Sequence, residues 1–149
     1  MTIKRFISIL KKKDYSYEIK GDKIIVTQDG RHVYLSALTS LPPGVEFKNR
    51  GGVYLDSLTS LPPGVEFNNR GDVDLSSLTS LPPGVVFKNE EHVYLRSLTS
   101  ISPGVKFNNE GYVSLNSLVG GWVDEWSGNI KGIESKRLFN LMISKGMFI

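Results

Sequence analysis

An eight-residue string that returns every 20 positions constrains this chain more than any other feature. Leu-Thr-Ser-Leu-Pro-Pro-Gly-Val begins at Leu38, Leu58 and Leu78, and it returns from Leu98 as Leu-Thr-Ser-Ile-Ser-Pro-Gly-Val. One unit of 20 residues cannot bury its own apolar face, whereas stacked units bury that face against one another. The repeat therefore predicts a stack of near-identical coils rather than a sandwich.

Each unit contains two segments that alternate apolar and polar residues, the period-two pattern of a half-buried strand. In the first unit these are Val33-Tyr34-Leu35 and Val45-Glu46-Phe47. They are separated by a corner at Pro43-Gly44, where proline removes a backbone donor and glycine permits positive φ. We predict a mainly β fold: a short, single-domain β-solenoid of about five coils, with parallel ladders in which successive coils lie about 4.8 Å apart.

The same alternation assigns four columns of apolar side chains to the inside of the coils. They are Leu35, Leu55, Leu75, Leu95 and Leu115; Leu38, Leu58, Leu78, Leu98 and Leu118; Leu41, Leu61, Leu81 and Ile101; and Phe47, Phe67, Phe87 and Phe107. An asparagine column, with Asp29 expected at its head, comprises Asn49, Asn69, Asn89 and Asn109. Stacked amides that hydrogen-bond along the axis can satisfy a tight corner, so we expect this column to be structural.

Both flanks of the repeat predict caps, because the open ends of a solenoid expose strand edges that favour association. The single folded unit divides into an N-terminal cap (residues 1–32), the repeat (33–118) and a C-terminal cap (119–149). In the N-terminal cap, Lys20-Gly21-Asp22 predicts a hairpin turn, and residues 25–30 are expected in register with the second strand of a coil. A short helix is predicted there by an apolar stripe of Ile3, Phe6, Ile7 and Leu10.

The C-terminal cap is predicted to combine a glycine-rich link with a helix. The link carries Trp122 and Trp126, which we expect to fold over the last coil. The helix begins after Ser135 and ends before Gly146.

The unit has the form Val-x-Leu-x-x-Leu-Thr-Ser-Leu-Pro-x-Gly-Val, which resembles leucine-rich-repeat-like units in small proteins of tailed bacteriophages and prophages. The resemblance covers residues 33–118, and Gly120-Gly121-Trp122 and Lys145-Gly146-Met147-Phe148 are similar to such proteins too. Ordinary leucine-rich repeats place an asparagine before the next leucine, whereas Ser36-Ala37 leads directly into Leu38. This shortening favours a compact all-β coil. The resemblance implies a phage or prophage origin and carries no assigned activity.

The residue types available for chemistry are few. The chain has no cysteine, which excludes disulfides and thiol nucleophiles and fits a reducing cytoplasm. His32 and His92 lie three periods apart, roughly 14 Å along the axis, too far to share a metal ion. Asp56, Asp72 and Asp74 are the best acidic candidates, for a calcium ion or for glycan cleavage. We expect no cofactor.

Within a repeat, fixed positions pack and variable positions are free to recognise. The outward residues of the first strand vary most and form a candidate protein-binding face, which we name the tyrosine face; it comprises His32, Tyr34, Tyr54, Asp56, Asp72, Asp74, His92, Tyr94, Arg96 and Tyr112. Tyrosine and arginine are enriched at protein interfaces. A second charged face follows the second strand and comprises Lys48, Arg50, Arg70, Lys88, Glu90 and Glu110.

These features lead us to expect a non-catalytic protein-binding module rather than an enzyme. The resemblance sharpens this to a phage-encoded inhibitor of a bacterial host or defence protein, acting in the host cytoplasm. No apolar run is long enough for a membrane helix, and the first 13 residues do not form a signal peptide. Four alternatives remain open: a calcium or glycan site at the aspartates, nucleic-acid binding through Lys11, Lys12 and Lys13 beside Tyr15 and Tyr17, a structural virion component, and a homo-oligomer through the caps.

Overall fold

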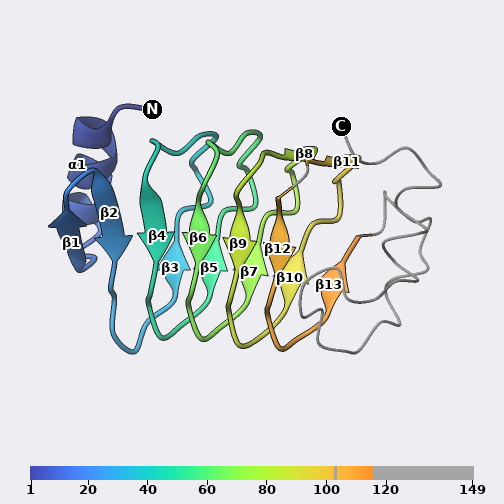
Figure 1. Cartoon of the computed structure of the whole chain (residues 1–149). Helices are drawn as coiled ribbons and strands as arrows, with labels where there is room; N and C mark the ends of the chain where they lie inside the picture. Colours follow the sequence, from blue (N-terminus) through green and yellow to red (C-terminus); the bar gives the residue numbers. More distant parts are fainter. Residues whose placement is uncertain (103, 116–149) are drawn as a thin grey trace.

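The computed structural model describes residues 1–102 and 104–115, which form one N-terminal helix and a β-solenoid of about four turns (Figure 1). The predicted mainly β fold with parallel ladders is confirmed. The predicted C-terminal cap (119–149), with Trp122, Trp126 and the helix after Ser135, lies outside the described residues, as does Leu118. Within the described residues, no helix has the length and apolar content needed to cross a bilayer.

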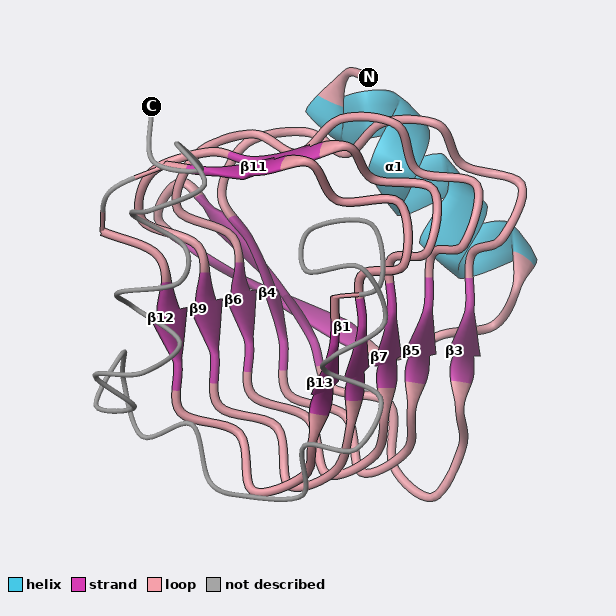
Figure 2. Ribbon diagram, turned by 90° about the vertical axis from the view of Figure 1, so that its right-hand side faces the viewer, coloured by secondary structure: helices cyan, strands magenta, loops and turns pink. Residues whose placement is uncertain are grey.

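Three sheets run along the axis, and Figure 2 shows two of them on opposite sides of the coils. The six-stranded sheet has the order β1 (Tyr17–Lys20), β2 (Lys23–Val26), β4 (Val45–Phe47), β6 (Glu66–Phe67), β9 (Val86–Phe87) and β12 (Lys106–Phe107). The five-stranded sheet has the order β13 (Val113–Ser114), β10 (Val93–Tyr94), β7 (Val73–Asp74), β5 (Val53–Tyr54) and β3 (Val33–Tyr34). The third sheet pairs β11 (Ser100–Ile101) with β8 (Ser80–Leu81).

The third ladder is absent from the sequence prediction, which gave each coil two strands. Its hydrogen bond from the Ser102 nitrogen to the Leu81 oxygen measures 2.9 Å. Pro42, Pro62 and Pro82 occupy the same position in the earlier coils, and proline has no N–H to donate. The ladder therefore forms only where serine replaces the first proline of the corner.

The register confirms the predicted columns in the described coils. Val33 pairs with Val53, Val53 with Val73, and Val73 with Val93, each one repeat apart. The phenylalanines stack along the axis with ring centroids 5.1–5.4 Å apart. All predicted inward leucines, phenylalanines and Ile101 up to Leu115 are buried. Stacking of like on like thus makes one continuous core from incomplete single coils.

The corners depend on glycine. Gly44, Gly64, Gly84 and Gly104 have φ between 76° and 84°, where residues with a Cβ are strained. Gly71 is needed for a different reason: a Cβ there would lie 2.4 Å from the backbone nitrogen of Gly52 in the preceding coil. The coils therefore approach one another too closely at this corner for a side chain on Gly71.

The N-terminal helix and hairpin form as predicted, but fewer residues of the predicted apolar stripe are fully buried. Helix α1 (Ile3–Lys12) begins after Thr2, whose hydroxyl accepts a hydrogen bond from the Arg5 nitrogen. Phe6 and Leu10 are fully buried on the first coil, whereas Ile3 is 43% exposed. Strands β1 and β2 form the predicted antiparallel hairpin, and β2 continues as a parallel neighbour of β4.

Joining the cap to the stack shifts the register by one residue, which corrects the predicted head of the asparagine column. Val26 pairs with Phe47, so Gln28 and not Asp29 precedes Asn49. Six residues separate Val26 from Val33, but only five separate Phe47 from Val53. Gln28 is buried and accepts a hydrogen bond from the Ser16 nitrogen at 2.8 Å, while Asp29 lies exposed. A neutral amide can be buried at much lower cost than a carboxylate.

The asparagine column is structural, but its amides do not bond to one another as we predicted. Nδ2 of Asn69 donates to the oxygens of Gly71 (2.9 Å) and Asp72 (3.2 Å) in its own coil, and to Gly51 (3.2 Å) in the coil before. The other asparagines repeat this pattern in whole or in part. Each Oδ1 is buried without a hydrogen-bond partner among the described residues; these atoms belong to Asn49, Asn69, Asn89 and Asn109. The amide nitrogen alone ties the corners together.

Candidate functional site

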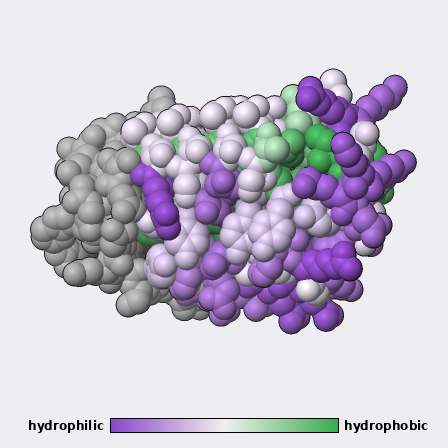
Figure 3. All heavy atoms as spheres, turned by 180° about the vertical axis from the view of Figure 1, so that it is seen from behind, coloured by the Kyte–Doolittle hydropathy of each residue, from purple (hydrophilic) through white to green (hydrophobic). Residues whose placement is uncertain are grey.

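The structure brings the ten residues of the tyrosine face to the outer side of the five-stranded sheet. Strand register aligns Tyr34, Tyr54, Asp74, Tyr94 and Ser114 in one row across β3, β5, β7, β10 and β13. Seen from behind, this side of the molecule mixes side chains of intermediate hydropathy with strongly hydrophilic ones (Figure 3). Alternation along each strand places these residues outward because their neighbours are the buried valines and leucines.

A first aromatic cluster lies at the N-terminal end of the face. The rings of Tyr34 and Tyr54 stack with centroids 5.0 Å apart, and His32 meets both rings edge-on at 5.8 and 5.7 Å. The side chain of Tyr34 is 51% exposed. This cluster therefore presents aromatic surface to solvent.

A second aromatic cluster lies three coils further along. His92 stacks on Tyr112 with centroids 3.8 Å apart, and Tyr94 meets Tyr112 edge-on at 5.9 Å. The hydroxyls of Tyr94 and Tyr112 share a hydrogen bond of 3.2 Å. The guanidinium of Arg96 lies over the Tyr94 ring, 5.1 Å from its centroid, within cation–π distance.

The two histidines have a backbone role that the sequence analysis missed. Nδ1 of His32 accepts a hydrogen bond from the Gly52 nitrogen at 2.8 Å, and Nδ1 of His92 accepts one from the Tyr112 nitrogen at 3.1 Å. Oδ1 of Asp72 accepts one from the His92 nitrogen at 3.0 Å in the same way. At the position just before the first strand of a coil, the side chain therefore accepts a hydrogen bond from the backbone nitrogen of the next coil. These bonds extend the hydrogen-bonded ladder beyond the strand. The signal was present in the sequence as an acceptor side chain immediately before the first valine of the unit.

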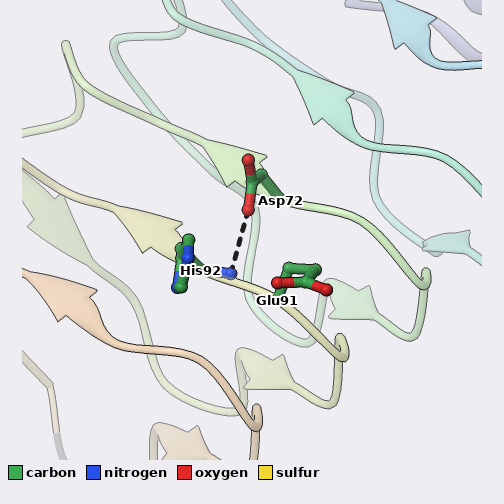
Figure 4. Close-up of side chains that lie close together, drawn as sticks. All are labelled: Asp72, Glu91 and His92. Carbon is green, nitrogen blue, oxygen red and sulfur yellow. Dashed lines mark hydrogen bonds between the residues drawn. The ribbon is translucent and has the colours of Figure 1, made fainter. Parts of the chain in front are cut away.

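The acidic residues that the structure brings together differ from the set that the sequence offered as an alternative calcium site. In the described part of the chain, the group of potential ligands within 4.8 Å of one another is Asp72, Glu91 and His92 (Figure 4), and Asp56 and Asp74 are not in it. Because Nδ1 of His92 accepts a backbone hydrogen bond, a neutral ring carries its proton on Nε2. Neither ring nitrogen then offers a lone pair, so this arrangement leaves two carboxylates as ligands.

Carboxylates give the middle of the tyrosine face a negative electrostatic potential. Burial raises the pKa of Tyr54, and the charges of Asp72, Tyr34 and Asp74 raise it further. Burial, the hydrogen bond with Tyr112 and the charge of Asp72 raise the pKa of Tyr94 in the same direction. Among the described residues, Asp56, Asp72, Asp74 and Glu91 form no ion pair.

The second charged face is different because four of its six charged side chains form ion pairs. Arg50 pairs with Asp29 at 3.3 Å and Arg70 with Glu90 at 3.6 Å. Lys48 pairs at 3.2 Å with Glu46, a nearly buried residue of β4. Lys88 and Glu110 form no ion pair within the described residues. The two faces of the solenoid thus differ in how far their charges are satisfied internally.

The basic segment of the N-terminal cap lacks free aromatic neighbours. Lys11 and Lys12 occupy the last turn of α1, where cations are favoured by the helix dipole. Tyr15 and Tyr17 pack against the hydrophobic core, and the Tyr15 hydroxyl accepts a hydrogen bond from the Tyr34 nitrogen at 2.9 Å. These tyrosines are therefore engaged in the cap rather than offered as a stacking platform for bases.

In comparisons with known proteins, no family model, no curated protein and no solved structure matches the chain. The structure itself shows the β-solenoid with its 20-residue repeat. The resemblance to phage proteins stays a prediction from the repeat motif.

Proposed function

We propose that the chain is a non-catalytic protein-binding module and that its tyrosine face contacts the partner. The observation that carries this proposal is the contrast between the two faces. The tyrosine face varies from coil to coil, exposes aromatic rings and leaves its carboxylates without ion pairs. Tyrosine and arginine are the residues most enriched at binding hot spots, and unpaired charge is available to a partner.

A finer proposal follows from the resemblance of the repeat to phage proteins. In this form the module is a phage-encoded inhibitor of a bacterial host or defence protein, acting in the host cytoplasm. A stable scaffold with a decorated surface suits such a role because binding alone can block a target. A structural role in the virion is the alternative that predicts no host partner.

The first experiment is affinity capture from a bacterial lysate with the intact chain and with a Tyr34→Ala/Tyr54→Ala/Tyr94→Ala variant. The matched control is Arg70→Ala/Lys88→Ala on the second charged face. Circular dichroism and thermal melting establish that each variant is folded. Each captured protein is then purified and its affinity for all three chains is measured by calorimetry.

The proposal expects a partner that binds the intact chain and the control variant but not the tyrosine variant. A partner that all three folded chains bind equally would remove the tyrosine face from consideration. A partner lost only with the control variant would assign binding to the second charged face instead.

A further inference from the structure

The row of outward side chains on the tyrosine face is interrupted at Asp74. Tyr34, Tyr54, Asp74 and Tyr94 occupy successive strands in register, so aspartate stands between strands that carry tyrosine at this position. Tyr54 and Tyr94 are two ladder steps apart, about 9.6 Å. The short side chain of Asp74 leaves the facing sides of these two residues without an aromatic neighbour in the row.

The carboxylate at this break is held in place but not neutralised. Oδ1 of Asp74 accepts hydrogen bonds from the backbone nitrogen and the hydroxyl of Ser76, while Oδ2 has no donor among the described residues. Asp72 lies two residues earlier on the same side of the strand, and it forms no ion pair in the described structure. Both residues contribute to the negative potential felt by Tyr54. The break is therefore fixed in shape and carries uncompensated negative charge.

The same face already holds one cation on a ring. The Arg96 guanidinium lies 5.1 Å from the centroid of the Tyr94 ring. Tyr54 and Tyr94 each stand one ladder step, about 4.8 Å, from Asp74, and cation–π attraction extends to about 6 Å from a ring centroid. The spacing of the row thus suits a cationic group above Asp74.

We propose that the break in the tyrosine row at Asp74 receives a lysine or arginine side chain from a basic segment of a partner protein. This inference rests on the proposed function and names the chemistry of the partner. The charge of the face selects the partner, because the four carboxylates at or beside the row (Asp56, Asp72, Asp74 and Glu91) outnumber the two cations there, Arg31 and Arg96. The aromatic rings favour an organic cation, which can lie against their faces. A metal ion is disfavoured because Nδ1 of His92 already accepts a backbone hydrogen bond.

The test uses the intact chain and a ten-residue peptide of alternating arginine and glycine. A peptide with citrulline in place of arginine keeps the shape and removes the charge. Binding is followed at low salt by fluorescence anisotropy and by amide chemical shifts. The variants are Asp74→Asn, which removes the charge, and Asp74→Tyr, which completes the row. The matched control is Asp22→Asn, an exposed carboxylate on the hairpin turn without an ion pair in the described structure.

The expected result is binding of the arginine peptide alone, with shifts centred on Tyr54, Asp74 and Tyr94. Asp74→Asn weakens binding about tenfold, since one charge-assisted contact is lost. Asp74→Tyr abolishes binding while the fold is retained, and Asp22→Asn binds like the intact chain. No binding to the intact chain, or equal loss in the Asp74→Asn and Asp22→Asn variants, overturns the inference.

A second arm separates this inference from the proposed function. Asp74→Tyr is added to the affinity capture from lysate. A partner that depends on Tyr34, Tyr54 and Tyr94 but is retained by Asp74→Tyr leaves the binding module intact and refutes the cationic contact. A partner lost with both variants, and competed by the arginine peptide, supports both.

Discussion

The substitution Asn69→Asp replaces the side-chain amide nitrogen with an oxygen. In the fold, this nitrogen is the donor in the side-chain hydrogen bonds that Asn69 makes among the described residues. Nδ2 donates to three carbonyl oxygens, those of Gly71, Asp72 and Gly51, at 2.9–3.2 Å. Oδ1 has no hydrogen-bond partner among the described residues, and Asn69 is 1% exposed. An ionised carboxylate would therefore face carbonyl oxygens in place of the hydrogen-bond donor that the amide supplies.

The cost of this change depends on pH. A protonated acid keeps one donor where the amide has two, so at pH 3 the loss is about 1 kcal/mol. In the unfolded chain the introduced acid ionises near its ordinary pKa of about 3.9, whereas burial against carbonyl oxygens raises its pKa in the fold. Each pH unit above about 4 then costs about 1.4 kcal/mol until the folded group also ionises. At pH 7 the expected loss is about 4–5 kcal/mol, close to the cost of an uncompensated buried charge.

Urea unfolding at pH 3 and pH 7 measures the free energy of unfolding of the variant and of the intact chain. Asn68→Asp is the control, because Asn68 is the exposed neighbour and undergoes the same chemical change. We expect the control to differ from the intact chain by at most about 0.5 kcal/mol at both pH values. If Asn69→Asp lowered the free energy of unfolding equally at pH 3 and pH 7, the conclusion that Asn69 stabilises the fold through donation from Nδ2 would be refuted.

Three further predictions concern the core, the corners and the tyrosines. Phe67→Ala should lower the free energy of unfolding by about 3–5 kcal/mol in urea titrations, because Phe67 is fully buried between two stacked rings. Gly44→Ala should destabilise the fold more than Gly64→Ala does: both have φ near 77°, but a Cβ at Gly44 would lie 2.5 Å from a backbone oxygen, and one at Gly64 meets open space. The difference between their melting temperatures measures this, and equal melting temperatures would contradict it. Tyr54 and Tyr94 should ionise last in an absorbance titration at high pH, because their pKa values are raised in the fold. Since the unfolded chain then releases these protons first, their contribution to stability is present below about pH 10 and is lost as the pH rises further; Tyr54→Phe and Tyr94→Phe variants should reduce that loss.

Much of the fold could be predicted from the sequence because one rule governs every coil. The period of 20 residues and the period-two alternation fix which side chains point inward, and the structure buries them as expected. The one-residue shift at Gln28 could not be predicted from the repeat, since it arises outside the repeated segment, in the longer link between Val26 and Val33. The third ladder depends on a single N–H at Ser102, which a pattern of hydrophobicity does not record.

The sequence predicted which residues lie on the tyrosine face, but it did not predict the contacts that they make. The sequence assigns His32, Asp72 and His92 to an outward face, and the structure places them there. Their hydrogen bonds to the backbone of the next coil depend on side-chain reach across a ladder step, which the residue type alone does not set. Glu91 was missed because it stands where three other coils have glycine, at a corner that we interpreted only as a turn.

The alternation along the short strands has a consequence for how such a protein can change over generations. In Val93–Tyr94, as in β3, β5 and β7, the first residue is buried in the core and the second is exposed or half-buried on the outer side. The main-chain ladder holds the outward residue whatever its identity, as tyrosine and aspartate at this position demonstrate. Mutations at alternate codons therefore fall under separate selection, so a new surface can arise one coil at a time without a new fold.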